Sequence, residues 1–219
     1  MSAVTLGAGA PGERPLQLSA AVGADARTGV AARPSLRGMA LAPPACGKRF
    51  VLADGRQAQV RPVRPSDASA ERAFVETLSI DSRRRRFHGA LAQLPMSLAV
   101  AMTRIDFHRQ VALVAEAPAS DGAMRLVADA RYVREEVARD DGDASAEFAI
   151  AVADDWQGQG LGRWLLGELA WHARLAGLTT LVGSVLLDNG PMLSLLERAG
   201  ARFEHDREDA RLVRAIVRL

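Results

Sequence analysis

Hydrophobic and polar residues follow two periods along this chain, and each period predicts one kind of element. Alternating positions and short apolar runs predict strands at residues 50–52, 58–63, 111–116, 126–133, 148–152, 180–187 and 212–219. Apolar residues three and four apart predict helices at residues 66–78, 97–103, 160–176 and 191–199, and residues 83–86 form a basic helical turn. This order predicts a mixed α/β fold, with a parallel crossover between the strands at 148–152 and 180–187.

Turn and cap residues refine the first part of this pattern. Asp54 and Gly55 predict a hairpin turn between the first two strands. Pro62 has no amide hydrogen to donate, so the second strand is expected to lie at an edge or to end early. Ser66 and Asp67 are expected to cap the first helix.

Residues 1–47 show neither period and are rich in Ala, Gly, Pro and Ser. They can bury little apolar surface, so we expect a flexible tail before a single domain at residues 48–219. Four of the 28 basic and two of the 26 acidic residues lie in 1–47, which leaves 24 of each in the domain. A domain without net charge argues against a nucleic-acid binder.

Other classes are disfavoured by what the sequence lacks. No apolar run approaches the roughly eighteen residues of a membrane span, and the N-terminus does not resemble a secretory signal. Cys46 is the only cysteine, so no internal disulfide is possible. The four histidines show no zinc-ligand spacing, so no metal site is expected. These features favour a cytoplasmic protein with no membrane or nucleic-acid partner.

The sequence Gln157-Gly-Gln-Gly-Leu-Gly162 lies between a predicted strand and an amphipathic helix. The first amides of a helix have no partner within it and form its positive end, and glycines let the backbone approach a phosphate closely. The loop therefore suits an anion. It is neither a P-loop, which ends in Gly-Lys-Ser or Gly-Lys-Thr, nor a dinucleotide fingerprint, whose third glycine comes one residue later. A glycine-rich turn that merely permits helix–strand packing is the alternative.

This loop resembles the Q/R-x-x-G-x-G/A motif of the GNAT superfamily of N-acetyltransferases, with Gln157, Gly160 and Gly162 at the fixed positions. The next part of the family pattern is a strand, an asparagine, a helix and a glycine, and residues 185–200 fit it with Asn189 after the strand. Residues 60–67, 78–87, 103–106, 111–115 and 146–149 further resemble the acetyltransferase domain of Pat-type bacterial protein lysine acetyltransferases.

The resemblance implies a central mixed sheet, flanked by helices, that splays open between two parallel strands at about 147–153 and 180–187. Acetyl-CoA is expected in this opening as a co-substrate, with its pyrophosphate on the amides of residues 157–162 and its pantetheine arm along the first strand. The residues implied to bind it are Val152, Ala153, Gln157, Gly158, Gln159, Gly160, Leu161, Gly162 and Asn189. The implied acceptor is an amine, and the Pat-type resemblance implies the side chain of a protein lysine.

Glu147 is the candidate catalytic base, because it begins the strand that leads to the glycine loop. A lysine amine has a pKa of about 10.4, so it must lose a proton before it attacks an acyl group. Strand alternation places Glu147 on one face with Ala149 and Ala151, whose small side chains leave room for an acyl group. Pat-type enzymes use a glutamate at this position, so the resemblance implies the same role. The alternative is a sheet-end glutamate paired with an arginine.

The sequence does not assign the group that protonates the departing thiolate. Many GNAT enzymes place a tyrosine seven residues after the asparagine, where this chain has Leu196. The single tyrosine, Tyr132, belongs to another predicted strand, which leaves water for this role. A free backbone amide at the splay is expected to stabilise the oxyanion.

Three alternatives accompany a protein lysine acetyltransferase. A GNAT enzyme that acts on a small amine would have a closed acceptor pocket instead of an open groove. A non-catalytic acyl-CoA sensor would bind CoA without turnover. A nucleic-acid binder is least favoured, because the four arginines at 83–86 point in several directions around a helix. We expect these arginines to pair with acids on a solvated helix, unless one of them shapes the acceptor cleft.

Overall fold

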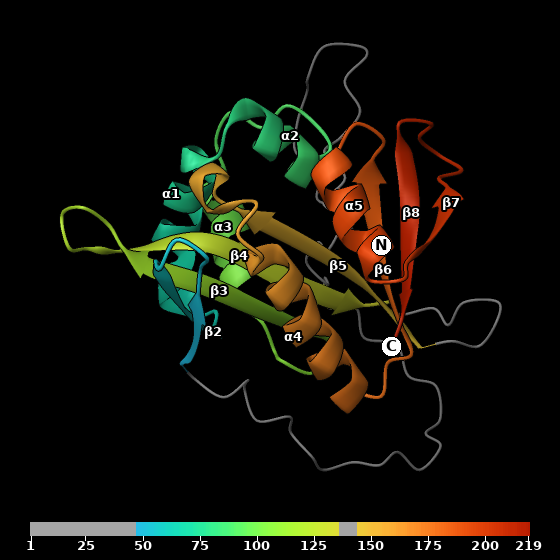
Figure 1. Ribbon diagram of the computed structural model, residues 1–219, viewed down its shortest axis with the longest axis horizontal. Coiled ribbons are helices and arrows are strands. Elements are labelled where there is room, and N and C mark those ends of the chain that lie inside the picture. The colour runs from blue at the N-terminus through green and yellow to red at the C-terminus, as the bar shows by residue number, and fades with distance from the viewer. Residues whose placement is uncertain (1–46, 136–143) are drawn as a thin grey trace.

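The computed structural model describes residues 47–135 and 144–219, which form one mixed α/β unit (Figure 1). The predicted tail and the expected turn at residues 140–143 lie outside the described residues. The described strands make a single sheet in the order β1-β2-β3-β4-β5-β6-β8-β7. The strands are β1 Lys48–Val51, β2 Gln57–Pro62, β3 Gln110–Pro118, β4 Met124–Arg134, β5 Ser145–Val152, β6 Thr180–Leu186, β7 Arg202–His205 and β8 Leu212–Arg218. The helices are α1 Ala68–Thr77, α2 Ile80–Phe87, α3 Met96–Thr103, α4 Leu161–Leu175 and α5 Gly190–Arg198, with short 3-10 helices at Pro65–Asp67 and Asp154–Trp156.

β5 and β6 are the one parallel pair among the described strands, and their pairing is short. It runs from Ser145 opposite Thr180 to Glu147 opposite Val182. Beyond these residues both strands continue without pairing to each other, and Figure 1 shows them diverging. The predicted parallel crossover and the predicted splay of the sheet are both present.

One face of the sheet packs against α4 and α5 (Figure 1). The side chain of Val152 in β5 lies on this face, since a β carbon added to Gly162 of α4 would lie 3.8 Å from its Cγ2 atom. Phe148 lies four residues before Val152 in β5. Because alternate residues of a strand share a face, its side chain points to the same face. The predicted apolar row of α4 packs here, because none of its residues is more than 1% exposed: Leu161, Leu165, Leu169 and Ala173.

The opposite face packs against α1, α2 and α3. Arg131 of β4 points to this face, where it donates hydrogen bonds to Glu71 of α1 and to the carbonyl oxygen of Met102 in α3. Arg131 is paired in register with Ala149 of β5, so Ala149 and Glu147 lie on this face too. The alternation predicted along β5 is therefore confirmed.

Three local features add to or refine the sequence expectations. β7 is a strand that the sequence analysis does not predict, and three of its four residues are exposed, so it shows no apolar pattern. β2 lies between β1 and β3 and ends at Pro62, so the proline ends the strand early and does not mark an edge. Asp67 precedes α1 without capping it through its side chain, because its carboxylate binds Arg61 at 2.7 Å and the amide of Arg64 at 2.7 Å.

Candidate active site

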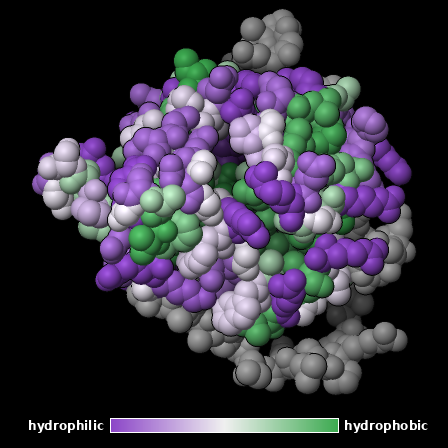
Figure 2. All heavy atoms as spheres, in the orientation of Figure 1, coloured by the Kyte–Doolittle hydropathy of each residue, from purple (hydrophilic) through white to green (hydrophobic). Residues whose placement is uncertain are grey.

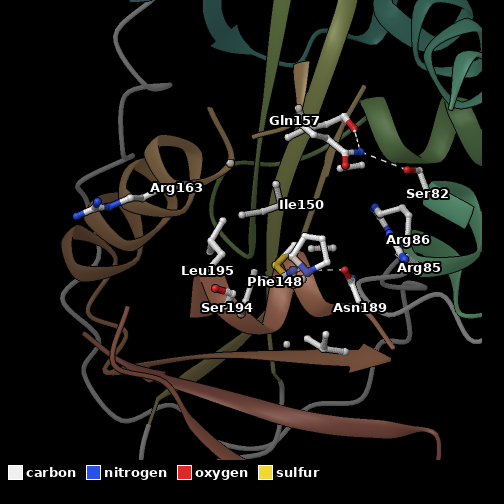
Figure 3. A pocket seen from close by; sticks show the side chains of 18 of the residues that line it. Ser82, Arg85, Arg86, Phe148, Ile150, Gln157, Arg163, Asn189, Ser194 and Leu195 are labelled. Carbon is white, nitrogen blue, oxygen red and sulfur yellow. Dashed lines mark hydrogen bonds between the residues drawn. The ribbon is translucent and has the colours of Figure 1, made fainter. Parts of the chain in front are cut away.

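A cavity of about 460 Å³ occupies the opening between β5 and β6. Its wall comes from α2, β5, residues 157–163, β6 and α5. Figure 2 shows a hollow on this face of the molecule, with hydrophobic residues inside it and hydrophilic residues around it. Figure 3 shows the same region from nearby, with Gln157, Phe148 and Asn189 placed around the space. The splay of the sheet thus creates a pocket with an apolar interior and a polar rim.

The glycine loop forms the wall of this cavity at the start of α4. Gly158 and Gly160 have φ angles of 71° and 87°, in the left-handed region that favours glycine. Gly160 is the N-cap of α4 and offers no side chain to its first amides. Gly162 lies so close to α5 that an added β carbon would be 3.3 Å from Cδ1 of Leu195. The loop therefore presents the positive end of a helix without a capping side chain, an arrangement that binds phosphate.

Gln157 and Asn189 line the cavity, and each makes a hydrogen bond within the protein. The Nε2 atom of Gln157 donates to the carbonyl oxygen of Val152 at 2.9 Å and to the hydroxyl of Ser82 at 3.2 Å (Figure 3). The Oδ1 atom of Asn189 accepts from the amide of Met192 at 3.3 Å and so caps α5. These two side chains hold the two rims of the opening in place.

The structure brings some of the predicted cofactor residues to the cavity and places others elsewhere. Those that line it are Val152, Gln157, Gly158, Gly160, Gly162 and Asn189. Ala153 and Leu161 are in the core at 8% and 1% exposure, and the amide of Ala153 donates to the carbonyl oxygen of Val127. Gln159 is partly buried outside the cavity lining.

α2 spans the opening and is tied to both of its rims (Figure 1). At its start, the carboxylate of Asp154 accepts hydrogen bonds from Ser79 and Ser82 at 2.7 to 2.8 Å. Burial opposes the charged form of Asp154, but these hydrogen bonds outweigh it and lower its pKa. On the other side, Arg84 pairs at 2.6 Å with Asp188, which follows β6. α2 thereby connects the end of β5 with the end of β6.

Glu147 lies at the apex of the opening, where the pairing of β5 with β6 ends. It is partly buried and shares the face of α1, α2 and α3 with Ala149. The residues that line the cavity begin at the next position, Phe148. Glu147 itself is not part of the cavity lining; it precedes the lining residues of β5, at the end of the opening away from the glycine loop.

A buried ionic cluster lies on the same face, and the sequence analysis does not predict it. Arg131 pairs with Asp129 at 2.6 Å and with Glu71 at 3.2 Å, and Arg86 pairs with Asp129 at 3.5 Å. Arg86 also lines the cavity, so the cluster extends from the core to the site. Burial, reinforced by the charge of Asp129, raises the pKa of Glu71 to about 8.

The cavity wall contains a histidine but no tyrosine. Tyr132 is 2% exposed, and burial raises its pKa to about 12. Leu196, at the position where many GNAT enzymes have a tyrosine, is fully buried in the core. His88 does line the cavity, and burial lowers its pKa, aided by the nearby charge of Arg86. His88 is therefore a neutral imidazole in the cavity wall at neutral pH.

Within residues 47–135 and 144–219, no three His, Cys, Asp or Glu side chains are grouped in a way that could hold a metal ion. None of the helices in this part of the chain combines the length and apolar character needed to cross a bilayer.

Comparison with known proteins identifies the family. The Acetyltransferase (GNAT) family matches residues 104–201, a range that includes β5, the glycine loop and α5. An acetyltransferase of Pseudomonas aeruginosa is 32% identical over 159 residues, which cover 73% of this chain and 82% of that relative. The chain belongs to the GNAT acetyltransferase family.

Two further proteins show that this GNAT acetyltransferase is similar to Pat-type enzymes. Acetyltransferase Pat of Mycolicibacterium smegmatis is 31% identical over 143 residues, which cover 65% of this chain but 40% of Pat, so the chain spans less than half of that relative. The GNAT domain of S. lividans PAT superposes with a TM-score of 0.70 and 30% identity, covering 81% of this chain and 99% of that domain. The GNAT fold and the resemblance to Pat-type acetyltransferases are therefore confirmed.

Proposed function

We propose that this GNAT protein transfers an acetyl group from acetyl-CoA to the side-chain amine of a protein lysine. The observation that carries the proposal is the opening between β5 and β6, with the glycine loop at its rim and Glu147 at its apex. This shape suits a long co-substrate that has phosphates at one end and a reactive thioester at the other.

The residues of the opening fit the two halves of acetyl-CoA. The first amides of α4, with Gly158 and Gly160, would bind the pyrophosphate through the positive end of the helix. From Phe148 to Val152, β5 has no strand paired on its β6 side, so its backbone groups can hydrogen-bond with the amides of the pantetheine arm. Asn189 stands on the opposite rim, where it would contact the same arm.

Glu147 would act as the general base, directly or through one water. It takes a proton from the lysine ammonium, and the neutral amine attacks the thioester carbonyl. The C–N bond forms, the C–S bond breaks, and the second proton of the nitrogen passes through water to the departing sulfur, so that CoA leaves as the thiol. An unpaired backbone amide of β5 would stabilise the oxyanion between these steps.

The acceptor class is supported by the likeness to Pat-type enzymes, which act on protein lysines. The match with the GNAT domain of S. lividans PAT covers 99% of that domain, so the likeness extends over the whole catalytic unit. A small-amine acceptor remains the alternative outcome of the experiment below.

The experiment measures thiol release from acetyl-CoA with a panel of lysine-bearing proteins and small amines. We expect Glu147→Gln to lower kcat at least about tenfold, with the affinity for CoA unchanged, because it removes the base and keeps the shape. Glu168→Gln is the matched control, since Glu168 pairs with Lys48 on the surface of α4.

The possible results separate the candidate functions. Turnover that is the same in Glu147→Gln and wild type would contradict the role of Glu147 but keep the acyltransferase. Turnover with small amines alone would assign the alternative acceptor. Tight binding of CoA without turnover of any acceptor would favour a non-catalytic acyl-CoA sensor.

A further inference from the structure

The charge of the cavity wall is one-sided. Among the described residues that line it there are four arginines and no aspartate or glutamate: Arg85, Arg86, Arg163 and Arg198. The phosphates of acetyl-CoA would neutralise cations close to the glycine loop. The arginines of α2 form a separate group, because they belong to another element of the cavity wall.

Two of these arginines belong to the side of the cavity formed by α4 and α5. Arg163 is in the first turn of α4, directly after the glycine loop, and Arg198 of α5 donates a hydrogen bond to Ser194 at 2.7 Å. Figure 3 shows Arg163 across the cavity from Arg85 and Arg86. Arg163 and Arg198 thus belong to one side of the cavity, and Arg85 and Arg86 to the other.

Arg85 and Arg86 are neighbours in α2, but they differ in their partners. Arg86 is 8% exposed and pairs with Asp129 at 3.5 Å. Arg85 is partly exposed, and the ion pairs of the described residues include Arg84 and Arg86 but not Arg85. The Nε atom of Arg85 is buried and has no hydrogen-bond partner among the described residues. Because buried donors are nearly always paired, Arg85 has bonding capacity left for a ligand.

The ionic cluster behind α2 does not neutralise Arg85. Since the pKa of Glu71 is raised to about 8, this carboxyl is mostly protonated at neutral pH, and Asp129 alone balances Arg86 and Arg131. The α2 side of the cavity also holds Asp188, which pairs with Arg84 at 2.6 Å and interacts electrostatically with Arg85. This side is also the face on which Glu147 lies, and so the face from which an amine would approach.

We propose that Arg85 binds a carboxylate of the acceptor, close to the amine that receives the acetyl group. The inference rests on the proposed function, because it assigns the acceptor of the same cavity. A guanidinium binds a carboxylate through two parallel hydrogen bonds, which fixes the orientation of the acceptor as well as its charge. The carboxylate can come from the α-carboxyl group of a free amino acid or from an acidic side chain beside a peptide lysine. With either source, the acceptor carries a carboxylate close to its reactive amine.

The test uses two pairs of acceptors that differ only in carboxylates. Nα-acetyl-lysine is compared with its amide, and the peptide acetyl-Gly-Glu-Lys-Glu-Gly-amide with its Gln-Lys-Gln counterpart, in the thiol-release assay. We expect kcat/KM to be about tenfold higher for the carboxylate member of one pair, and that pair identifies the source. Arg85→Gln should abolish the preference, and Arg85→Lys should restore part of it. Arg72→Gln makes the same charge change on the surface of α1, where Arg72 pairs with Glu76, and should keep the preference.

Three results would overturn the proposal. They are equal kcat/KM within both pairs, a preference that survives Arg85→Gln, and an effect of Arg85→Gln confined to the KM for acetyl-CoA. If no acceptor is acetylated, the proposed function fails, and calorimetry on the CoA-saturated protein decides the inference separately. A Kd about tenfold lower for one carboxylate member, lost in Arg85→Gln, supports the carboxylate site, and equal Kd values overturn it.

Discussion

The carboxyl group of Glu71 is completely buried between α1 and the sheet. Its Oε1 atom accepts a hydrogen bond from Arg131, and its Oε2 atom has no hydrogen-bond partner among the described residues. Burial raises its pKa from an ordinary value of 4.5 to about 8, so the folded protein holds a proton that the unfolded chain releases. A single residue in the core therefore links the stability of the protein to pH.

We expect the free energy of unfolding to fall as the pH rises from about 5 to about 8, because the folded state binds more protons than the unfolded state in this range. One group contributes a slope of at most about 1.4 kcal/mol per pH unit. Glu71→Gln removes the titrating group and should flatten the profile measured by urea unfolding across this range. Glu76→Gln, on the exposed surface of the same helix, should keep the wild-type slope. Parallel profiles for Glu71→Gln and wild type would contradict this account.

At the scale of residues, the sequence identified the glycines of the loop but not the environments of its neighbours. Arg85 and Arg86 are the same residue type at adjacent positions of the cavity wall, and only the packing of α2 pairs Arg86, and not Arg85, with Asp129. Asp129 and Arg131 could have been noticed as charges inside an apolar strand. Their partner Glu71 could not, because it lies about 60 residues earlier in the chain.

At the scale of elements, α4 contains glycines with opposite structural demands. Gly160 is the N-cap with a φ of 87°, whereas Gly167 is in the exposed middle of the helix, where an added β carbon meets nothing within 4 Å. We expect Gly160→Ala to raise the Kd for acetyl-CoA about tenfold, because a left-handed alanine costs roughly 1–2 kcal/mol and the loop shifts to avoid it. Calorimetric titration with acetyl-CoA measures the change.

Gly167→Ala is the matched control in the same helix. It should leave the Kd for acetyl-CoA unchanged and raise the free energy of unfolding by about 0.5–1 kcal/mol, since alanine favours the helix interior. If Gly160→Ala bound acetyl-CoA as tightly as Gly167→Ala, the conformation of the loop would not matter for binding.

The elements that face the core were predicted from their periods, whereas β7 and the position of α2 were not. α4 shows a full apolar row, and its predicted range differs from the observed Leu161–Leu175 by one residue at each end. β7 is mostly exposed and is held by pairing with β8, which no local pattern reveals. The position of α2 across the opening depends on Asp154 and Asp188, both of them distant in the chain from the helix that they hold.

At the scale of the whole molecule, the sheet consists of two parts joined at the apex of the opening. The first part contains β1 to β5 and the second contains β6, β8 and β7. β5 pairs with β6 over a few residues from Ser145 to Glu147, whereas β6 pairs with β8 along the whole of its length, from Thr180 to Leu186. A ligand that fills the opening would bridge the two parts.

We expect acetyl-CoA at about one hundred times its Kd to raise the free energy of unfolding by about 2.7 kcal/mol, provided that it binds only the folded state. Hydrogen exchange should slow most at the facing edges of the opening, in residues 148–152 and 183–186, and in the glycine loop at 157–162. Protection confined to the glycine loop would mean that the ligand stays at the rim and does not enter the sheet.

The position of β8 between β6 and β7 also sets an order of events during protein synthesis. β1 to β5 are adjacent in the sheet in the order in which they leave the ribosome, so each can pair with its predecessor as it emerges. β6 and β7 both pair with β8, so neither pairing can form until residues 212–218 have been translated. The nascent chain can therefore assemble one wall of the cavity early, but the other wall lacks its central strand until residues 212–218 have been translated.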